Sequence, residues 1–202
     1  MDLAYYRRLL HGIIVSEIDG KWGLFWAYAR QYLRKAGLDK VLGYKAVYKR
    51  VEYNAGGRSP FIDVFAVIAN EKCTHMVPVG VEVKASRTIN VEQVRREVSL
   101  LPNFMSHDYD NRYRLVEAIR KRCGVYSSTH MWLYILIVPG SIVKRVDELV
   151  RLAKSGMGWY GDERFFKHTV IPLEGVVSAL SVKNDLVELV NHWDLIALGR
   201  AN

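Results

Sequence analysis

The sequence predicts an α/β domain in which helices flank a mixed sheet, and three patterns support this class. Apolar residues recur at helical spacing between residues 16 and 35. Strand-like segments separated by polar turns then follow within residues 44–84, as in an antiparallel meander. Residues 132–138 are apolar throughout, which is typical of a parallel strand covered on both faces. The expected sheet is therefore a three-stranded meander extended by parallel strands.

The individual elements follow from periodicity and from their boundary residues. The first helix is expected to begin after Ser16, a natural N-cap, and to end before Gly37. The second helix is expected to stop at Pro102, because the residue before a proline avoids the helical conformation. The predicted helices comprise residues 16–35, 91–101, 115–121, 142–154 and 174–191. The predicted strands comprise residues 44–53, 61–67, 77–84, 132–138 and 165–173.

Length and composition indicate one globular domain. A chain of 202 residues fits a single domain, with a core at about residues 16–138 and a C-terminal elaboration at residues 139–202. Cys73 and Cys123 imply neither a disulfide framework nor a zinc ribbon. The start of the chain lacks the pattern of a signal peptide, and its longest apolar run is too short to span a bilayer. We therefore expect a cytoplasmic protein without a membrane partner.

Asp63, Glu82 and Lys84 point most directly to a chemistry. Valine occupies every odd position of residues 77–83, so Glu82 and Lys84 share the other face of that strand. Asp63 lies in an apolar strand, where a carboxylate needs a partner. Two carboxylates and a lysine on paired strands would suit a divalent metal ion and phosphodiester hydrolysis. The alternative for Glu82 and Lys84 is an ion pair on an exposed strand.

This arrangement resembles the PD-(D/E)XK nuclease superfamily, in which an acidic residue on one strand precedes a Glu/Asp-x-Lys motif on the next. The pattern here is SPFID at residues 59–63, with isoleucine at the position before the aspartate, followed by EVK at residues 82–84. The nearest likeness is to archaeal Holliday junction resolvases and RecB-like nucleases. The resemblance implies a restriction-endonuclease-like core. It also implies that Asp63, Glu82 and the Val83 carbonyl bind Mg²⁺ or Mn²⁺. Lys84 is then implied to position or help deprotonate the attacking water and to stabilise the developing negative charge.

The same resemblance supplies two further catalytic candidates. Glu17 fits the acidic residue that family members place on the first helix, and Gln93 fits the glutamine on the helix after the motif strand. Each residue also has a structural explanation. An acid in the first turn of a helix complements the helix dipole, and Asn90-x-x-Gln93 matches a capping box.

The charge of the chain favours an anionic partner. The formal net charge is +8, and the cations occur in short clusters suited to a phosphate backbone. The candidates for phosphate contacts are Arg58, Ser59, Ser86, Arg87, Arg95 and Arg96. For each of them the alternative is a turn, a helix cap or an ordinary solvated surface.

These expectations combine into a Mg²⁺-dependent DNA nuclease that hydrolyses phosphodiester bonds with a metal-activated water. The resemblance favours branched DNA as substrate, and a role in recombination or repair. We expect a homodimer, because two-fold related sites suit the cutting of two strands. The alternative is a nucleic-acid-binding protein that keeps the nuclease fold without catalysis.

Overall fold

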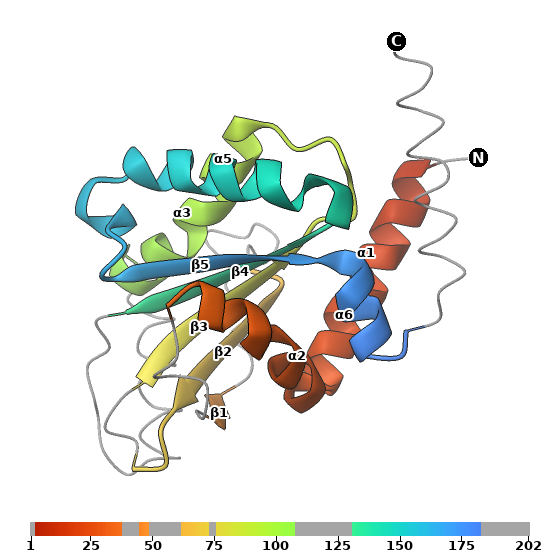
Figure 1. Ribbon diagram of the computed structural model, residues 1–202, viewed down its shortest axis with the longest axis horizontal. Helices are drawn as coiled ribbons and strands as arrows, with labels where there is room; N and C mark the ends of the chain where they lie inside the picture. Colours follow the sequence, from red (N-terminus) through yellow and green to blue (C-terminus); the bar gives the residue numbers. More distant parts are fainter. Residues whose placement is uncertain (1–2, 38–44, 49–61, 73–75, 108–130, 183–202) are drawn as a thin grey trace.

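The computed structural model describes residues 3–37, 45–48, 62–72, 76–107 and 131–182, and it has the α/β architecture predicted from the sequence (Figure 1). The strands are β1 (Lys45–Tyr48), β2 (Val64–Ala69), β3 (Met76–Val83), β4 (Trp132–Val138) and β5 (Phe166–Pro172). The helices are α1 (Leu3–Gly20), α2 (Trp22–Lys35), α3 (Val91–His107), α5 (Val143–Ser155) and α6 (Leu173–Ala179). Short 3₁₀ turns at Gly140–Ile142 and Gly158–Gly161 flank α5.

The sheet is mixed, with strand order β1-β2-β3-β4-β5. Strands β1, β2 and β3 pair antiparallel, which confirms the predicted meander. Strands β3, β4 and β5 pair in parallel, with Glu82 opposite Leu136 and Val83 opposite Ile137. All seven residues of β4 are buried, as predicted for a central strand covered on both faces.

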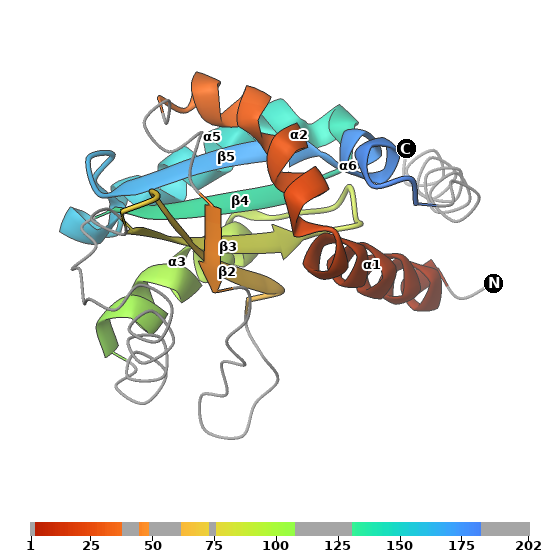
Figure 2. The ribbon, with the colours of Figure 1, turned by 90° about the horizontal axis from the view of Figure 1, so that it is seen from below.

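Helices cover both faces of the sheet (Figures 1 and 2), and each face has its own apolar core. Helices α1, α2 and α6 pack on one face against the odd-numbered residues of β3, such as Val81 and Val83. Helices α3 and α5 pack on the other face, against side chains that include Tyr134 and Leu136 of β4. The alternation of side chains along a strand therefore directs Glu82 toward the α3 face.

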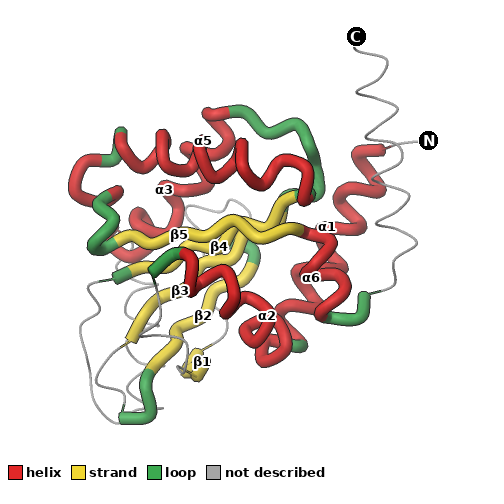
Figure 3. The backbone as a smooth tube through the Cα atoms, viewed as in Figure 1, coloured by secondary structure: helices red, strands yellow, loops and turns green. Residues whose placement is uncertain are grey.

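The first helix differs from the sequence prediction. Helix α1 begins at Leu3, and Ser16 lies inside it rather than at its N-cap. Leu10, Ile14 and Ile18 are buried at a spacing of four residues, so the apolar stripe of α1 extends well before Ser16. A break at Lys21 separates α1 from α2, and both helices are visible in the backbone trace of Figure 3.

Two other helix ends were also predicted wrongly. Helix α3 continues through Pro102 to His107. A proline removes one helical hydrogen bond, but the packing of the rest of the helix can compensate for this loss. Helix α6 ends at Ala179, and Ser181 follows with a φ of 52°, a left-handed conformation that ends a helix. The expected stop of α2 is confirmed, since Gly37 has a φ of 73°. The helix predicted at residues 115–121 lies outside the described residues.

Among the described residues, no helix has the length and apolar character that crossing a membrane requires.

Candidate functional site

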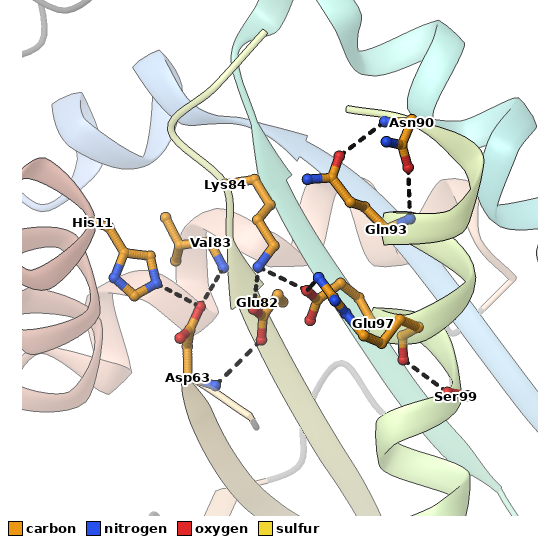
Figure 4. A network of polar contacts seen from close by, with 10 residues as sticks. His11, Asp63, Glu82, Val83, Lys84, Asn90, Gln93, Glu97 and Ser99 are labelled. Atoms are coloured by element: carbon orange, nitrogen blue, oxygen red, sulfur yellow. Dashed lines mark hydrogen bonds and ion pairs between the residues drawn. The ribbon is translucent and has the colours of Figure 1, made fainter. Parts of the chain in front are cut away.

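Asp63 and Glu82 meet where β2 begins and β3 ends. Asp63 occupies the bend directly before β2 rather than the strand interior. Because Val64 pairs with Val81, the antiparallel register brings Asp63 beside Glu82. The Val83 amide donates to Asp63 Oδ2 at 2.8 Å, and the Asp63 amide donates a longer bond of 3.4 Å to Glu82 Oε2 (Figure 4). The strand register therefore brings together the two carboxylates predicted from the sequence.

Lys84 lies between two carboxylates. Its Nζ donates to Glu82 Oε1 at 2.7 Å and lies 3.0 Å from Glu97 Oε1 of α3 (Figure 4). The Lys84 amide donates to Ile137 O at 2.8 Å, which ties its backbone to the end of β4. Burial acts to lower the pKa of Lys84, but the charges and hydrogen bonds of Glu82 and Glu97 outweigh it and raise that pKa. Lys84 is therefore held as an ammonium group aimed at the carboxylates.

Glu82 is a buried acid with an altered affinity for protons. Only 4 % of the residue is exposed. Burial is the main cause that raises its pKa well above the usual value, and the negative charge of Asp63 adds to this effect. The nearby ammonium of Lys84 acts in the opposite direction without cancelling it. A second positive charge near Asp63 and Glu82 would stabilise their ionised forms.

The oxygen atoms of this carboxylate pair are suitable ligands for a magnesium ion. Mg²⁺ prefers hard oxygen ligands and usually takes only one or two carboxylates, with waters and phosphate oxygens completing its shell. Asp63 and Glu82 supply two such carboxylates, and the contacts of Asp63 with the Val83 amide and with His11 both use Oδ2 rather than Oδ1. Within the described ranges, no group of three or more His, Cys, Asp or Glu side chains is placed to hold an ion. Among the described residues, this pair would therefore be the side-chain contribution to the ion.

His11 belongs to this site, although the sequence analysis did not identify it. Its Nε2 lies 2.9 Å from Asp63 Oδ2, across 52 residues of sequence (Figure 4). The helix prediction began at Ser16 and so left His11 outside any element. Extending the four-residue spacing of Ile14 and Ile18 back to Leu10 would have placed His11 on this helix, next to its buried stripe.

The sequence analysis also missed Glu97. This residue lies beside Lys84, the position at which Gln93 was predicted. Glu97 is 8 % exposed and contacts Lys84 one helical turn after Gln93. Gln93 forms the predicted capping box with Asn90, which donates its amide to Gln93 Oε1 at 3.1 Å and accepts the Gln93 amide at 2.8 Å. The signal available in the sequence was the position of Glu97 next to Val98 and three residues after Val94, at the apolar face of the predicted helix.

Tyr134 lies beneath the carboxylates on the α3 face. It lies opposite Gly80 of the neighbouring strand β3. Its hydroxyl is buried without a hydrogen-bond partner among the described groups. Burial is the main cause that raises the pKa of Tyr134, and the negative charges of Glu82, Glu97 and Asp63 raise it further. This tyrosine is therefore a neutral group in the floor of an acidic site.

A cavity of about 220 Å³ opens beside the carboxylates, between α1, the end of β3 and the start of α3. Ser86, Gln93 and Arg96, predicted from the sequence as site residues, are part of its wall, together with Lys84 and His11. The Ser86 hydroxyl accepts the Thr88 amide at 3.2 Å, as in the turn proposed as its alternative role.

The remaining candidates lie elsewhere. Glu17 pairs with Lys21 at 2.5 Å in the last turn of α1, so the placement of Glu17 in a first helical turn was wrong. This difference follows from the earlier start of α1. Arg95 pairs with Glu92 at 2.6 Å on α3, and Arg87 does not line the cavity. Arg58 and Ser59 lie outside the described residues.

Comparisons of the chain with protein-family models, with curated proteins and with solved structures find no match. The functional interpretation therefore depends on the geometry of the site. That geometry consists of a carboxylate pair, a lysine held between two acids, a histidine on Asp63 and an adjoining cavity.

Proposed function

We propose that the protein is a Mg²⁺-dependent DNA nuclease, with Asp63, Glu82 and Lys84 as its catalytic residues. The observation that carries this proposal is the contact of Asp63 with the Val83 amide beside the 2.7 Å bond between Lys84 and Glu82. Two acids and one ammonium group thus converge at the end of a single strand. A structural ion pair would need Glu82 and Lys84 but not the neighbouring Asp63.

The order of elements supports the proposal. A helical segment, three antiparallel strands, a helix and a parallel strand follow each other from α1 to β4. This is the order expected of a restriction-endonuclease-like core, in which the acidic residues lie on the second and third strands. We therefore include that core in the proposal.

The residues divide the chemistry among them. When bound, the metal ion would activate a water molecule and polarise the phosphoryl group. Asp63, oriented by His11 and by the Val83 amide, would bind the ion together with Glu82 and the Val83 carbonyl. Lys84 would donate hydrogen bonds to phosphate oxygens and stabilise the negative charge that develops on them. A water molecule that has lost a proton to solvent would attack phosphorus through its oxygen. The bond from phosphorus to the leaving oxygen would break without a covalent enzyme intermediate, and the leaving oxygen would take up a proton from solvent.

The positive charge near the site supports a nucleic acid as substrate. Arg7 and Arg8 of α1 and Arg96 of α3 line the cavity next to Lys84. Together with the net charge of +8, they would favour a phosphate backbone. Branched DNA as substrate, and a homodimer that cuts two strands, are the finer parts of this proposal.

Cleavage by the purified protein tests the proposal. Linear, single-stranded and four-way DNA would be incubated at low salt with Mg²⁺ or Mn²⁺, and cutting should disappear with a chelator. Glu82→Gln and Lys84→Ala should lower the rate at least 100-fold, because each removes a group needed in the transition state. Glu148→Gln and Lys144→Ala change exposed residues of α5 and are the matched controls.

The results of these assays distinguish a nuclease from a protein that only binds nucleic acid. If either site variant folds and cuts at the parent rate, the assigned roles are wrong. Salt-dependent DNA binding without metal-dependent cutting would instead support the alternative, a nucleic-acid-binding protein with this fold.

A further inference from the structure

The cavity beside Lys84 combines an apolar wall with a group of basic side chains. Five buried apolar residues from the end of β3, the following turn, α3 and β4 form the wall: Val83, Ala85, Ile89, Val94 and Leu136. The basic side chains come from α1, from the residue after β3 and from α3: Arg7, Arg8, His11, Lys84 and Arg96. The carboxylate of Glu97, which binds Lys84, also lines the cavity. A ligand that satisfies both parts has an apolar surface and an anionic group.

This combination matches a nucleotide better than a simple anion. An inorganic phosphate would use the cations but would cover none of the apolar surface that Ala85 and Ile89 leave accessible. A nucleotide would place its base against the wall and its phosphate among the cations. Ser86, Thr88 and Gln93 also line the cavity and provide polar groups for the edge of a base.

The size of the cavity restricts the ligand to a single base. A volume of about 220 Å³ lies below the roughly 300–1,000 Å³ of pockets that hold drug-sized ligands. This suits one nucleobase of roughly ten non-hydrogen atoms and excludes a base pair. A base that enters the cavity must therefore have left its partner.

The cavity shares residues with the proposed catalytic site. Lys84 lines the cavity and binds Glu82 through the same Nζ, and His11 lines the cavity and contacts Asp63. Val83 belongs to the wall, while its amide holds Asp63. A nucleotide with its base in the cavity would thus carry its phosphate to the carboxylate pair.

We infer that the cavity receives one unpaired nucleotide of the substrate strand, so that the substrates are single-stranded, frayed or mismatched DNA rather than continuous duplex. This inference rests on the nuclease function proposed above and names its substrate class. Extruding a base from a duplex costs least where the base is mismatched or already single-stranded. The cavity therefore selects the substrate by the ease with which a base leaves the stack.

Binding measurements test the inference separately from cutting. Fluorescence anisotropy would compare a fully paired duplex, the same duplex with one mismatch, and the single strand, all with the full chain at low salt and without divalent ions. Thr88→Trp places a large side chain at an exposed position of the cavity rim. Leu152→Trp, on an exposed position of α5 away from the cavity, is the control.

We expect the parent protein to bind the single strand and the mismatched duplex at least tenfold more tightly than the paired duplex. Thr88→Trp should lose this preference, and Leu152→Trp should keep it. Equal affinity of the parent for all three DNAs would overturn the inference, as would a Thr88→Trp variant that behaves like Leu152→Trp.

Cleavage of the same three DNAs with Mn²⁺ distinguishes the two proposals. Cutting of all three at one rate would overturn the cavity assignment and leave the nuclease function in place. A binding preference without any cutting would overturn the nuclease function and still support the cavity as a site for an unpaired nucleotide.

Discussion

The imidazole of His11 holds the carboxylate of Asp63, with 2.9 Å between Nε2 and Oδ2. The two residues come from α1 and from the bend before β2. Asp63 Oδ2 also accepts the Val83 amide at 2.8 Å, so two donors set the orientation of one carboxylate. This relationship makes α1 part of the proposed site.

The variant His11→Ala should impair the proposed reaction without unfolding the protein. The loss of one donor to Asp63 should weaken Mn²⁺ binding and lower the cleavage rate by about 10- to 100-fold, the usual effect of removing a partner of a metal ligand. His11→Gln can place an amide near the position of Nε2 and should recover part of the rate. The Mn²⁺ dependence of cleavage would measure both effects. An unchanged dependence in His11→Ala would show that Asp63 needs no such support.

Glu97 should set the position and charge of Lys84. In Glu97→Gln the hydrogen bond to Lys84 Nζ can remain, but one of the negative charges that raise the Lys84 pKa is lost. We expect a moderate fall in cleavage rate for Glu97→Gln and a larger one for Glu97→Ala, which also removes the hydrogen bond. Single-turnover rates measured over a range of pH would test this order. Equal rates in the parent and both variants would contradict it.

At pH values near the pKa of Glu82, metal binding should release protons from the protein. Because burial and Asp63 raise that pKa, Glu82 keeps its proton at pH values where an exposed glutamate is ionised. A metal ion must displace this proton, so Mn²⁺ affinity should increase with pH. Calorimetry in two buffers with different ionisation enthalpies would measure the protons released. Glu82→Gln should release fewer, and equal release would place the proton elsewhere.

Lys154 should stabilise the packing of α5 against β5. This lysine is 2 % exposed, and its Nζ donates to Glu163 Oε1 at 2.6 Å and to Phe166 O at 2.5 Å. Lys154→Met keeps most of the aliphatic stem but leaves the Phe166 carbonyl without this donor, which should cost about 1–3 kcal/mol in the free energy of unfolding. Urea denaturation would measure the loss. Lys144→Met, at an exposed position of the same helix, should change the free energy by less than about 0.5 kcal/mol.

The same cluster should make stability depend on pH through His168. Its Nδ1 lies 3.2 Å from Lys154 Nζ, and its Nε2 lies 3.1 Å from Asp147 Oδ1. Burial and then the charge of Lys154 lower the His168 pKa below its usual 6.5, against the opposing charges of Asp147 and Glu163. The unfolded chain therefore binds the proton more readily, so the stability present above pH 6.5 should decrease as the pH falls through 6.5 toward the lower folded value.

Unfolding free energies of the parent and of His168→Gln at pH 7.5 and 5.5 would measure this dependence. Other titrating groups are common to both proteins, so the parent should lose more stability between the two pH values than the variant does. An equal loss in both would remove His168 as the cause.

The sequence alone predicted much of the sheet and part of the site. The alternating valines before Glu82 and the continuous apolar run of β4 report local geometry, since a strand repeats every two residues. The contact between Glu82 and Lys84 follows from the same repeat. The capping box of Asn90 and Gln93 is also local, because its partners are three residues apart.

Where helices end was less predictable. Pro102 lowers helix propensity, yet α3 continues through it to His107. Ser16 has the chemistry of an N-cap, but the burial of Leu10 and Ile14 extends α1 beyond it. Local signals of this kind compete with burial energies that depend on the rest of the chain.

By itself, the sequence determined the class of the fold and identified two carboxylates and a lysine at the ends of neighbouring strands, because strand periodicity is a short-range property. Only the tertiary structure decided that His11 meets Asp63 and that Glu97 meets Lys84. Their helices pack on opposite faces of the sheet and reach the end of β3 from both sides. Helical periodicity tells which face of a helix is buried, but the element that this face meets is chosen by packing across long separations in the sequence.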